Sequence, residues 1–234
     1  SDQVAILCSA LPEFNAVWGP GMRWWQQSKP PQEVGNLTRV RSALLDQRIY
    51  PLPRPAGDDS PHLPRVATEG TVPTSAGPLR IINTHIAYHN RKETEDQIAF
   101  ICRLQAEEVA NREKPPARRT GSYADLFRTA SAVLCGDLNL TPDDPCYSIL
   151  KESHFSDGWR ACNPIAPHPA TCGIYDRQTW SEGPHCRDYF WVAHDLTHLI
   201  TELHVDQQTE LSDHQPLLLT LNLNLVSAFN GDAL

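Results

Sequence analysis

Residues 132–139 read Ala132-Val133-Leu134-Cys135-Gly136-Asp137-Leu138-Asn139, and this stretch decides which fold we expect. The short apolar run 132–135 is typical of a buried strand. In extended backbone, Asp137 and Asn139 are two residues apart and point to the same side. Carboxylate and amide oxygens suit a hard cation such as Mg²⁺, and Gly136 permits close backbone approach. The same pattern also fits an Asp/Asn pair at a turn whose side chains form hydrogen bonds with the neighbouring backbone.

A second polar segment, Ser212-Asp213-His214-Gln215-Pro216, precedes a stretch in which leucines alternate with other residues over 216–225. This alternation predicts a half-buried strand. His214 titrates near neutral pH and is therefore suited to accept a proton from water, and Asp213 offers a cation ligand or an acceptor. The alternative interpretation is a polar cap to the strand.

Two further segments, Asn83-Thr84-His85 and Arg187-Asp188-Tyr189-Phe190, also lie at the ends of predicted strands. A single His or Asp in such a place is more often structural than catalytic. Four segments that bear acids, amides or histidines at strand ends nevertheless predict one shared active site.

The rest of the chain predicts an α/β sandwich with helices on the outer faces of packed sheets. Residues 65–72 and 79–85 predict a hairpin, and strands are expected at 189–193 and 203–205. A capping-box pattern at 94–97 predicts a helix that ends near Glu113, before Pro115 and Pro116. The Pro- and Gly-rich stretches 12–34 and 51–64 predict surface loops, and residues 114–130 predict an exposed basic insertion.

Composition narrows the possible functions. The 234 residues carry a formal net charge of −8, with 40% hydrophobic and 21% charged residues. These values predict one globular domain and disfavour a protein that grips duplex nucleic acid, although a local basic patch or a bound metal can reverse the field at one site. No apolar run reaches the length of about 18 residues that spans a bilayer. We see no signal peptide and expect a cytoplasmic location.

The seven cysteines do not form a repeating pattern. An odd number without regular spacing is typical of free thiols in a reducing compartment rather than of a disulfide framework. An alternative interpretation is a zinc-stabilised binding domain, although the chain has no C-x-x-C pair. Its zinc ligands would come from Cys162, Cys172 and Cys186, with His168 and His185 nearby.

Together, the Asn83–His85, Gly136–Asp143, Arg187–Phe190 and Ser212–Pro216 segments resemble the endonuclease/exonuclease/phosphatase superfamily, which has the deoxyribonuclease-I-like fold. The order and spacing of the segments match, as do the G-D-x-N and S-D-H-x-P signatures. The resemblance covers about residues 1–225, with a tail at 226–234. It implies a four-layer α/β/β/α sandwich and a divalent-metal-dependent phosphoester hydrolase.

The resemblance also implies a role for each matching residue. His214 activates the attacking water, Asp188 orients His214, and His85 assists at the phosphate or leaving group. The residues that match positions around Mg²⁺ or Mn²⁺ and the scissile phosphate are Asp137, Asn139 and Asp213. Matches to substrate-contacting positions are Asn83, Arg65 and Asn36.

The chain departs from the family at its N-terminus. Members open with a strand that bears a metal-site Asn, followed by a strand that ends in Gln-Glu. Residues 1–11 instead look like the helix after that Gln-Glu, so we expect the first two strands to be missing. Gln32-Glu33 repeats the letters within a proline-rich stretch, and we do not assign it to the site. One alternative is therefore a catalytically inactive interaction module on the same fold.

The substrate class stays open at this point. A small phosphodiester, single-stranded nucleic acid, or a lipid headgroup such as sphingomyelin or a phosphoinositide would fit. Residues 84–150 have some likeness to neutral sphingomyelinases, but we find no membrane-inserting helix and no evident obligate protein partner.

Overall fold

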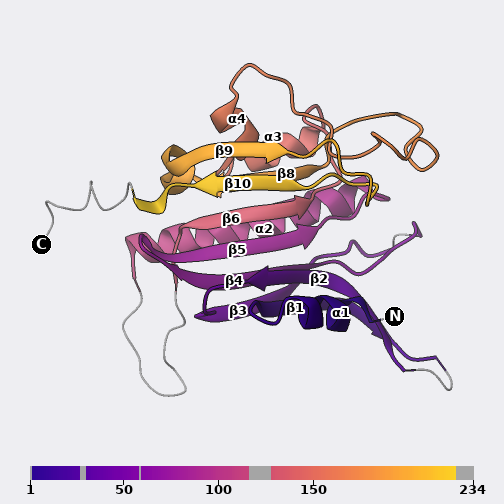
Figure 1. Cartoon of the computed structure of the whole chain (residues 1–234), viewed down its shortest axis with the longest axis horizontal. Helices are drawn as coiled ribbons and strands as arrows, with labels where there is room; N and C mark the ends of the chain where they lie inside the picture. Colours follow the sequence, from indigo (N-terminus) through magenta and orange to yellow (C-terminus); the bar gives the residue numbers. More distant parts are fainter. Residues whose placement is uncertain (1, 27–29, 58, 116–127, 225–234) are drawn as a thin grey trace, which may run out of the picture.

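A six-stranded mixed sheet forms the centre of the protein (Figure 1). The computed structural model describes residues 2–26, 30–57, 59–115 and 128–224. Neighbouring strands of the sheet are antiparallel except β5 and β6, which are parallel. In spatial order the strands are β3 (Asp46–Pro51), β4 (Val66–Thr74), β5 (Gly77–His85), β6 (Ala132–Asp137), β8 (Asp188–Ala193) and β7 (Phe155–Asp157).

Two antiparallel hairpins form a second strand layer on one face of this sheet. One hairpin pairs β1 (Asn15–Trp24) with β2 (Gln32–Val40) and contacts β4 and β5. The other pairs β9 (Ile200–Val205) with β10 (Leu217–Leu221) and contacts β8. Apolar side chains from both hairpins join one cluster with the central strands. That cluster includes Val40, Leu44, Ile81, Val133, Val192, Leu219 and Leu221.

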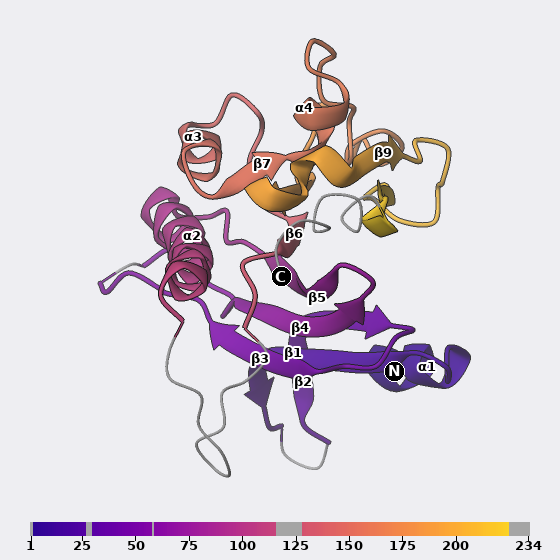
Figure 2. The same cartoon turned by 90° about the vertical axis from the view of Figure 1, so that its left-hand side faces the viewer.

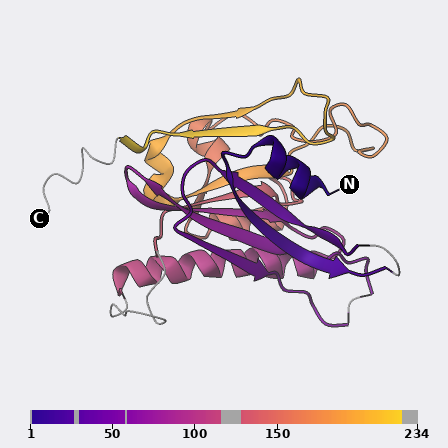
Figure 3. The ribbon, with the colours of Figure 1, turned by 60° about the horizontal axis from the view of Figure 1, so that its bottom comes forward.

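Helices cover the opposite face of the sheet. The long helix α2 (Arg91–Glu113) lies along this face with α3 (Pro145–Lys151) beside it (Figures 2 and 3). The larger core lies between these helices and the sheet. Its fully buried members include Ile82, Ile98, Ile101, Leu134, Leu138, Leu150 and Trp191. Three shorter helices are α1 (Gln3–Ala10), α4 (Gly158–Cys162) and the 3₁₀ helix η2 (His194–Leu199), and α1 has no buried residue.

The hairpin of β4 and β5 confirms the strand prediction for residues 65–85. Its turn is tighter than the six residues expected, because pairing continues through Pro73 with Pro78 to Thr74 with Gly77. Gly77 has φ +104, which allows the tight reversal. The predicted strands at 132–135, 189–193 and 203–205 are confirmed as parts of β6, β8 and β9.

The prediction of a surface loop at 12–34 is wrong, because most of this stretch forms β1 and the start of β2. The register of the pair shifts between Pro20 and Met22, so Pro20 and its glycine neighbours occupy a bulge. Each of these strands has only one hydrogen-bonded neighbour among the described residues. A proline without an N–H is tolerated at such an edge bulge.

The predicted start of the long helix is also wrong, although its end at Glu113 is confirmed. The helix begins at Arg91, and the side chain of Asn90 caps it by accepting from the N–H of Glu93 at 3.1 Å. Thr94, the expected cap, lies in the second turn, where its hydroxyl donates to the carbonyl of Ala87 at 2.8 Å. Two i,i+4 ion pairs, Arg91 with Glu95 and Lys92 with Asp96, lie on the helix surface and stabilise its first turns.

Leucine alternation correctly predicts β10, but the strand ends at Leu221 rather than near 225. Leu225, the tail 226–234 and most of the basic insertion, 116–127, lie outside the described residues. No helix in the described part of the chain is both long and apolar enough to cross a bilayer.

Candidate active site

Strand register brings three of the predicted residues to one end of the central sheet. Asp137, the last residue of β6, pairs with His85 at the end of β5 and with Asp188 at the start of β8. The parallel strands β5 and β6 thus end at this edge of the sheet, and the antiparallel strand β8 begins there. His85 Nε2 lies 3.4 Å from Asp137 Oδ2.

Gly136 allows the strands to meet this closely. Its φ is +126, and a Cβ at this position would lie 2.0 Å from the carbonyl oxygen of Thr84 on β5. No other residue type fits such a contact without moving the backbone. The glycine beside Asp137 therefore has the close-approach role expected from the sequence.

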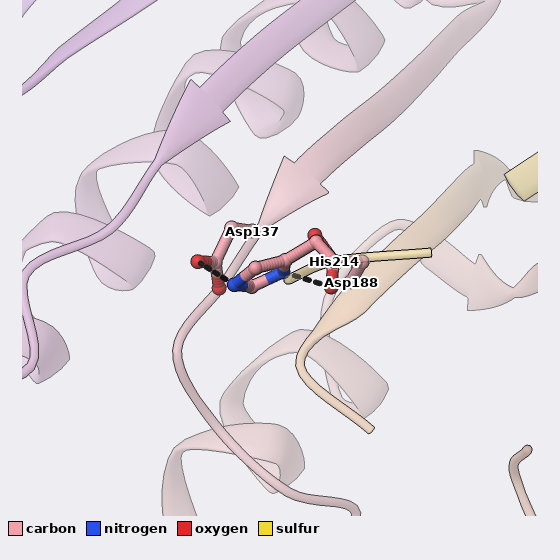
Figure 4. Close-up of side chains that lie close together, drawn as sticks. All are labelled: Asp137, Asp188 and His214. Carbon is pink, nitrogen blue, oxygen red and sulfur yellow. Dashed lines mark hydrogen bonds and ion pairs between the residues drawn. The ribbon is translucent and has the colours of Figure 1, made fainter. Parts of the chain in front are cut away.

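His214 reaches the site from the connection between β9 and β10. An isolated bridge pairs it with Cys172, and the N–H of Gln215 donates to the carbonyl of Thr171 at 2.7 Å. His214 Nδ1 lies 2.8 Å from Asp188 Oδ2, which leaves Nε2 directed toward Asp137 Oδ2 at 3.9 Å (Figure 4). Because Oδ2 of the Asp188 carboxylate accepts this hydrogen bond, Nδ1 is the donor, and Nε2 of neutral His214 is free to accept a proton.

Thr171 belongs to the site, and the sequence reasoning missed it. Its hydroxyl accepts from the N–H groups of Arg187 and Asp188, at 2.9 and 3.0 Å, and donates to Asp188 Oδ2 at 2.7 Å. The residue is 1% exposed. Because it stands in an irregular segment 17 positions from Asp188, no spacing or periodicity in the sequence points to it.

The electrostatics of the site separate the roles of its groups. Burial and the neighbouring Asp188 raise the pKa of Asp137 to about 6. The hydrogen bond to Asp188 raises the pKa of His214 above its usual value. Burial and the positive charges of Arg65 and His214 lower the pKa of His85 to about 4, so His85 is neutral at neutral pH.

One possible metal-ligand atom from each of three residues, Asp137, Asp188 and His214, lies within 4.8 Å of the other two. The oxygens of the two carboxylates suit a divalent cation such as Mg²⁺ or Mn²⁺, while Nε2 of His214 stays free as a proton acceptor. Burial and the neighbouring Asp188 both oppose ionisation of Asp137, and a cation at this position would offset both effects.

Asn139 lies directly beyond β6 but is already engaged by protein groups. Its φ is +51, its N–H donates to Asp137 Oδ1 at 2.8 Å, and its side-chain amide donates to the carbonyl of Ile86 at 2.8 Å. The amide oxygen accepts from Arg187 Nη1 at 3.1 Å. A metal at Asn139 would compete with Arg187 for this oxygen, so the metal role of Asn139 stays a prediction.

Two other predicted residues, Asp213 and Arg65, act on the site through their charges. Asp213 is exposed on the β9–β10 connection and lies outside the group formed by Asp137, Asp188 and His214. Arg65 directly precedes β4, and its charge acts on Asp137 and His85. Within the described chain its buried Nε has no hydrogen-bond partner.

Asn83 and Asn36 instead join strands. Asn83 donates to the carbonyl of Leu37 at 3.2 Å and to the hydroxyl of Thr38 at 3.1 Å, which ties β5 to β2. Asn36 donates to the carbonyl of Val66 at 2.8 Å, which ties β2 to β4. Both side chains are thus engaged between strands, and their substrate-binding role stays a prediction.

The cysteines are free thiols. Cys172 Sγ lies 3.4 Å from His185 Nε2. Among the described residues, however, Cys162, Cys172 and Cys186 do not form a group of metal ligands. Gln32 and Glu33 lie in β2, where Glu33 accepts from Trp18 Nε1 at 3.0 Å and pairs with Arg23.

Comparison with known protein sequences finds one group of relatives. No family model matches the chain. Protein angel homolog 1 of Homo sapiens is 30% identical over 136 residues, which is 56% of this chain. The match covers 16% of the human protein, so the chain is similar to a minor part of that relative.

Comparison with solved structures identifies the fold. The endonuclease/exonuclease/phosphatase from Bacteroides vulgatus has a TM-score of 0.65 at 18% identity, over 94% of this chain and 81% of that one. The 3' phosphatase NExo from Neisseria, bound to product DNA hairpin, has a TM-score of 0.61 at 18% identity, over 95% and 85%. The predicted α/β sandwich and the resemblance to this superfamily are thereby confirmed at the level of the fold, with the second strand layer present as two separate hairpins.

Proposed function

We propose that this chain, which has the endonuclease/exonuclease/phosphatase fold, hydrolyses phosphodiester bonds with the help of a divalent cation. The arrangement of His214, Asp188 and Asp137 carries the proposal, because it joins an oriented base to a carboxylate site for a cation. The names of the structural relatives, nucleases and phosphatases among them, support phosphoester chemistry in general.

His214 acts as the general base. Water attacks phosphorus and forms a new P–O bond, while its proton passes to Nε2 of His214. Asp188 holds the ring in the required tautomer and stabilises the imidazolium that results. The bond from phosphorus to the leaving oxygen breaks, and that oxygen takes up a proton from the solvent or from a neighbouring group.

The remaining residues bind and orient the phosphate. A divalent cation held by Asp137 and its neighbours would neutralise phosphate oxygens and stabilise the charge of the transition state. His85, neutral at neutral pH, is placed beside Asp137 to hydrogen-bond the phosphate or the leaving group. Arg65 adds a positive charge on the same side.

A substrate panel tests this proposal. Bis(p-nitrophenyl) phosphate serves as a generic diester, p-nitrophenyl phosphate as a monoester, a single-stranded oligonucleotide as nucleic acid, and sphingomyelin vesicles as lipid. Each is assayed with Mg²⁺, with Mn²⁺ and with excess chelator. We expect turnover of a diester with metal and none with chelator.

Each outcome of the panel has a defined meaning. Turnover of only the monoester would show that the activity is that of a phosphomonoesterase rather than of a phosphodiesterase. Folded protein that turns over no substrate with either metal would contradict the proposal and favour an inactive interaction module.

A further inference from the structure

The loop between Gly173 and Gly183 places an aromatic ring beside the proposed base. Its two ends meet closely, since a Cβ on Gly173 would lie 2.5 Å from the carbonyl oxygen of Gly183. Asp176 Oδ1 accepts from the N–H groups of Gln178 and Thr179, at 3.1 and 2.9 Å, and so orders the turn before Trp180. The Trp180 ring then lies edge-on to His214, with the ring centroids 5.4 Å apart.

Arg187 is fixed by three groups around its guanidinium. The guanidinium carbon lies over the Trp180 ring, 5.0 Å from its centroid. Nε donates to His185 Nε2 at 2.6 Å, and Nη1 donates to the amide oxygen of Asn139 at 3.1 Å. His185 Nδ1 lies 2.7 Å from the carbonyl of Gly183 and must donate to it, which leaves Nε2 as an acceptor for Arg187.

All three of these partners are uncharged. A π face, an imidazole nitrogen and an amide oxygen orient the guanidinium without neutralising it. Within the described chain, no carboxylate forms an ion pair with Arg187. Other arginines do form such pairs, for example Arg80 with Glu69 at 2.6 Å. A cation held rigidly against Asn139, two residues from Asp137, but left without an ion-pair partner is suited to an anionic ligand.

Backbone bonds place Arg187 at the reacting end of the sheet. Its N–H donates to the Thr171 hydroxyl at 2.9 Å, and its carbonyl accepts from the N–H of Leu138 at 2.9 Å. The residue therefore stands between the segments that carry Asp137 and Asp188. The Arg187 guanidinium lies over the Trp180 ring of the loop. Arg187 directly precedes β8, whereas Arg65 directly precedes β4, and β5 and β6 lie between these two strands.

We propose that Arg187 binds the phosphoryl oxygens of the substrate, and that Trp180 and His185 position its guanidinium for this contact. The inference rests on the proposed function for the identity of the substrate. Binding of the phosphate itself requires only the geometry of the site. Arg187 is a catalytic residue in this account, and Trp180 and His185 are positioning residues.

The test measures binding of inorganic phosphate by isothermal titration calorimetry, with and without Mg²⁺, so that it does not depend on turnover. We expect Arg187→Ala to weaken phosphate binding about 10- to 100-fold, the usual effect of losing a charge-assisted hydrogen bond. Arg187→Lys keeps the charge but loses the planar fork, and it should recover only part of the affinity. Millimolar guanidinium should partly restore phosphate binding to Arg187→Ala, which a purely structural role would not allow.

Arg103→Ala is the matched control, because Arg103 also lies over an aromatic ring, at 5.1 Å from the Phe100 centroid, but on the helix α2. This variant should bind phosphate as the unmodified protein does. Equal affinities of Arg187→Ala and Arg103→Ala, or no phosphate binding by the unmodified protein, would overturn the inference.

Turnover of the generic diester, measured in parallel, separates this inference from the proposed function. Lost phosphate binding in Arg187→Ala with no turnover by the unmodified protein would leave the anion site standing without the hydrolase. Unchanged phosphate binding in Arg187→Ala with normal turnover would leave the hydrolase standing without this role for Arg187.

Discussion

His214, Asp188 and Thr171 form a chain in which each hydrogen has a defined acceptor. The Thr171 hydroxyl accepts two backbone N–H groups, so its own hydrogen is directed to Asp188 Oδ2. The same oxygen accepts from His214 Nδ1. The position of the base thus depends on a buried threonine that does not contact the substrate in our account.

Thr171→Val tests this dependence. The valine keeps the shape but removes the hydroxyl, so Asp188 loses one hydrogen bond and its fixed orientation. We expect kcat to fall about 10-fold or more, the usual consequence of misplacing a general base, with little change in KM. Thr171→Ser should recover most of the rate. Thr94→Val, which removes another buried hydroxyl without a contact to Asp188 or His214, is the control, and equal kcat in the two valine variants would exclude the role of Thr171.

Asp188→Asn should move the acid limb of the pH–rate profile. Asp188 raises the pKa of His214, and only the unprotonated ring can act as base. Removing the carboxylate lowers that pKa toward its usual value, so the acid limb should shift to lower pH while the maximal rate falls. A profile measured on kcat/KM checks this, and a shift to higher pH would contradict the assignment of His214 as base.

The strands determine where these side chains meet. Register alone aligns His85, Asp137 and Asp188 across β5, β6 and β8. The alignment requires β5 and β6 to approach at Gly136, where no side chain fits. Local backbone geometry at one residue therefore controls the spacing of the whole site.

Gly136→Ala should cost stability and displace Asp137. The new Cβ meets the Thr84 carbonyl, and the positive φ is unfavourable for alanine, so we expect a loss of about 3 kcal/mol or more in the free energy of unfolding. Gly77→Ala is the matched control, because Gly77 also has positive φ but has no atom within 4 Å of the added Cβ. Its expected cost is about 1–2 kcal/mol. Equal losses in urea unfolding would show that the contact with Thr84 is unimportant.

The elements that the sequence predicts well are those with a strong local pattern. The alternation in β10, the apolar run of β6 and the hairpin of β4 and β5 each follow from side-chain periodicity. β1 was missed because Pro20 and two glycines look like a loop, whereas a bulge at an edge accommodates them. The start of α2 was missed because two local signals competed, and Asn90 rather than Thr94 made the cap.

The candidate site shows the same division. His85, Asp137 and Asp188 are terminal residues of strands and His214 lies shortly before one, so their sequence positions indicated one sheet edge. Thr171 and Trp180 lie in irregular segments, and their contacts arise only from tertiary structure. No periodicity could have connected them to the site.

Across the whole molecule, a second buried polar cluster joins two short helices to strand β7 at the edge of the sheet. Asp157 Oδ2 lies 2.6 Å from the Tyr147 hydroxyl and 2.7 Å from His168 Nε2, and Oδ1 accepts from the N–H of Arg160 at 3.1 Å. These contacts connect α3, β7 and α4 through one carboxylate. They give the fold a dependence on pH that is separate from catalysis.

Asp157→Asn should reveal that dependence. Burial opposes ionisation of Asp157, but the hydrogen bonds from His168 and Tyr147 outweigh it and lower the carboxyl pKa. A lowered pKa stabilises the folded state above the unfolded value of about 3.9, and this stability is lost as the pH falls through the folded pKa. The free energy of unfolding of the unmodified protein should be about 1–3 kcal/mol larger than that of the variant at pH 7, and the two values should converge in acid. A difference that is independent of pH in urea unfolding would contradict this account.

The central claim is that His214 is the base of a metal-dependent hydrolase, and single-turnover hydrolysis of bis(p-nitrophenyl) phosphate tests it most directly. The rate is compared for the unmodified protein and His214→Ala, with Mg²⁺ or Mn²⁺ and with chelator, after circular dichroism confirms that both are folded. We predict metal-dependent hydrolysis that falls at least about 100-fold in His214→Ala. A near-normal rate in this folded variant would contradict the claim.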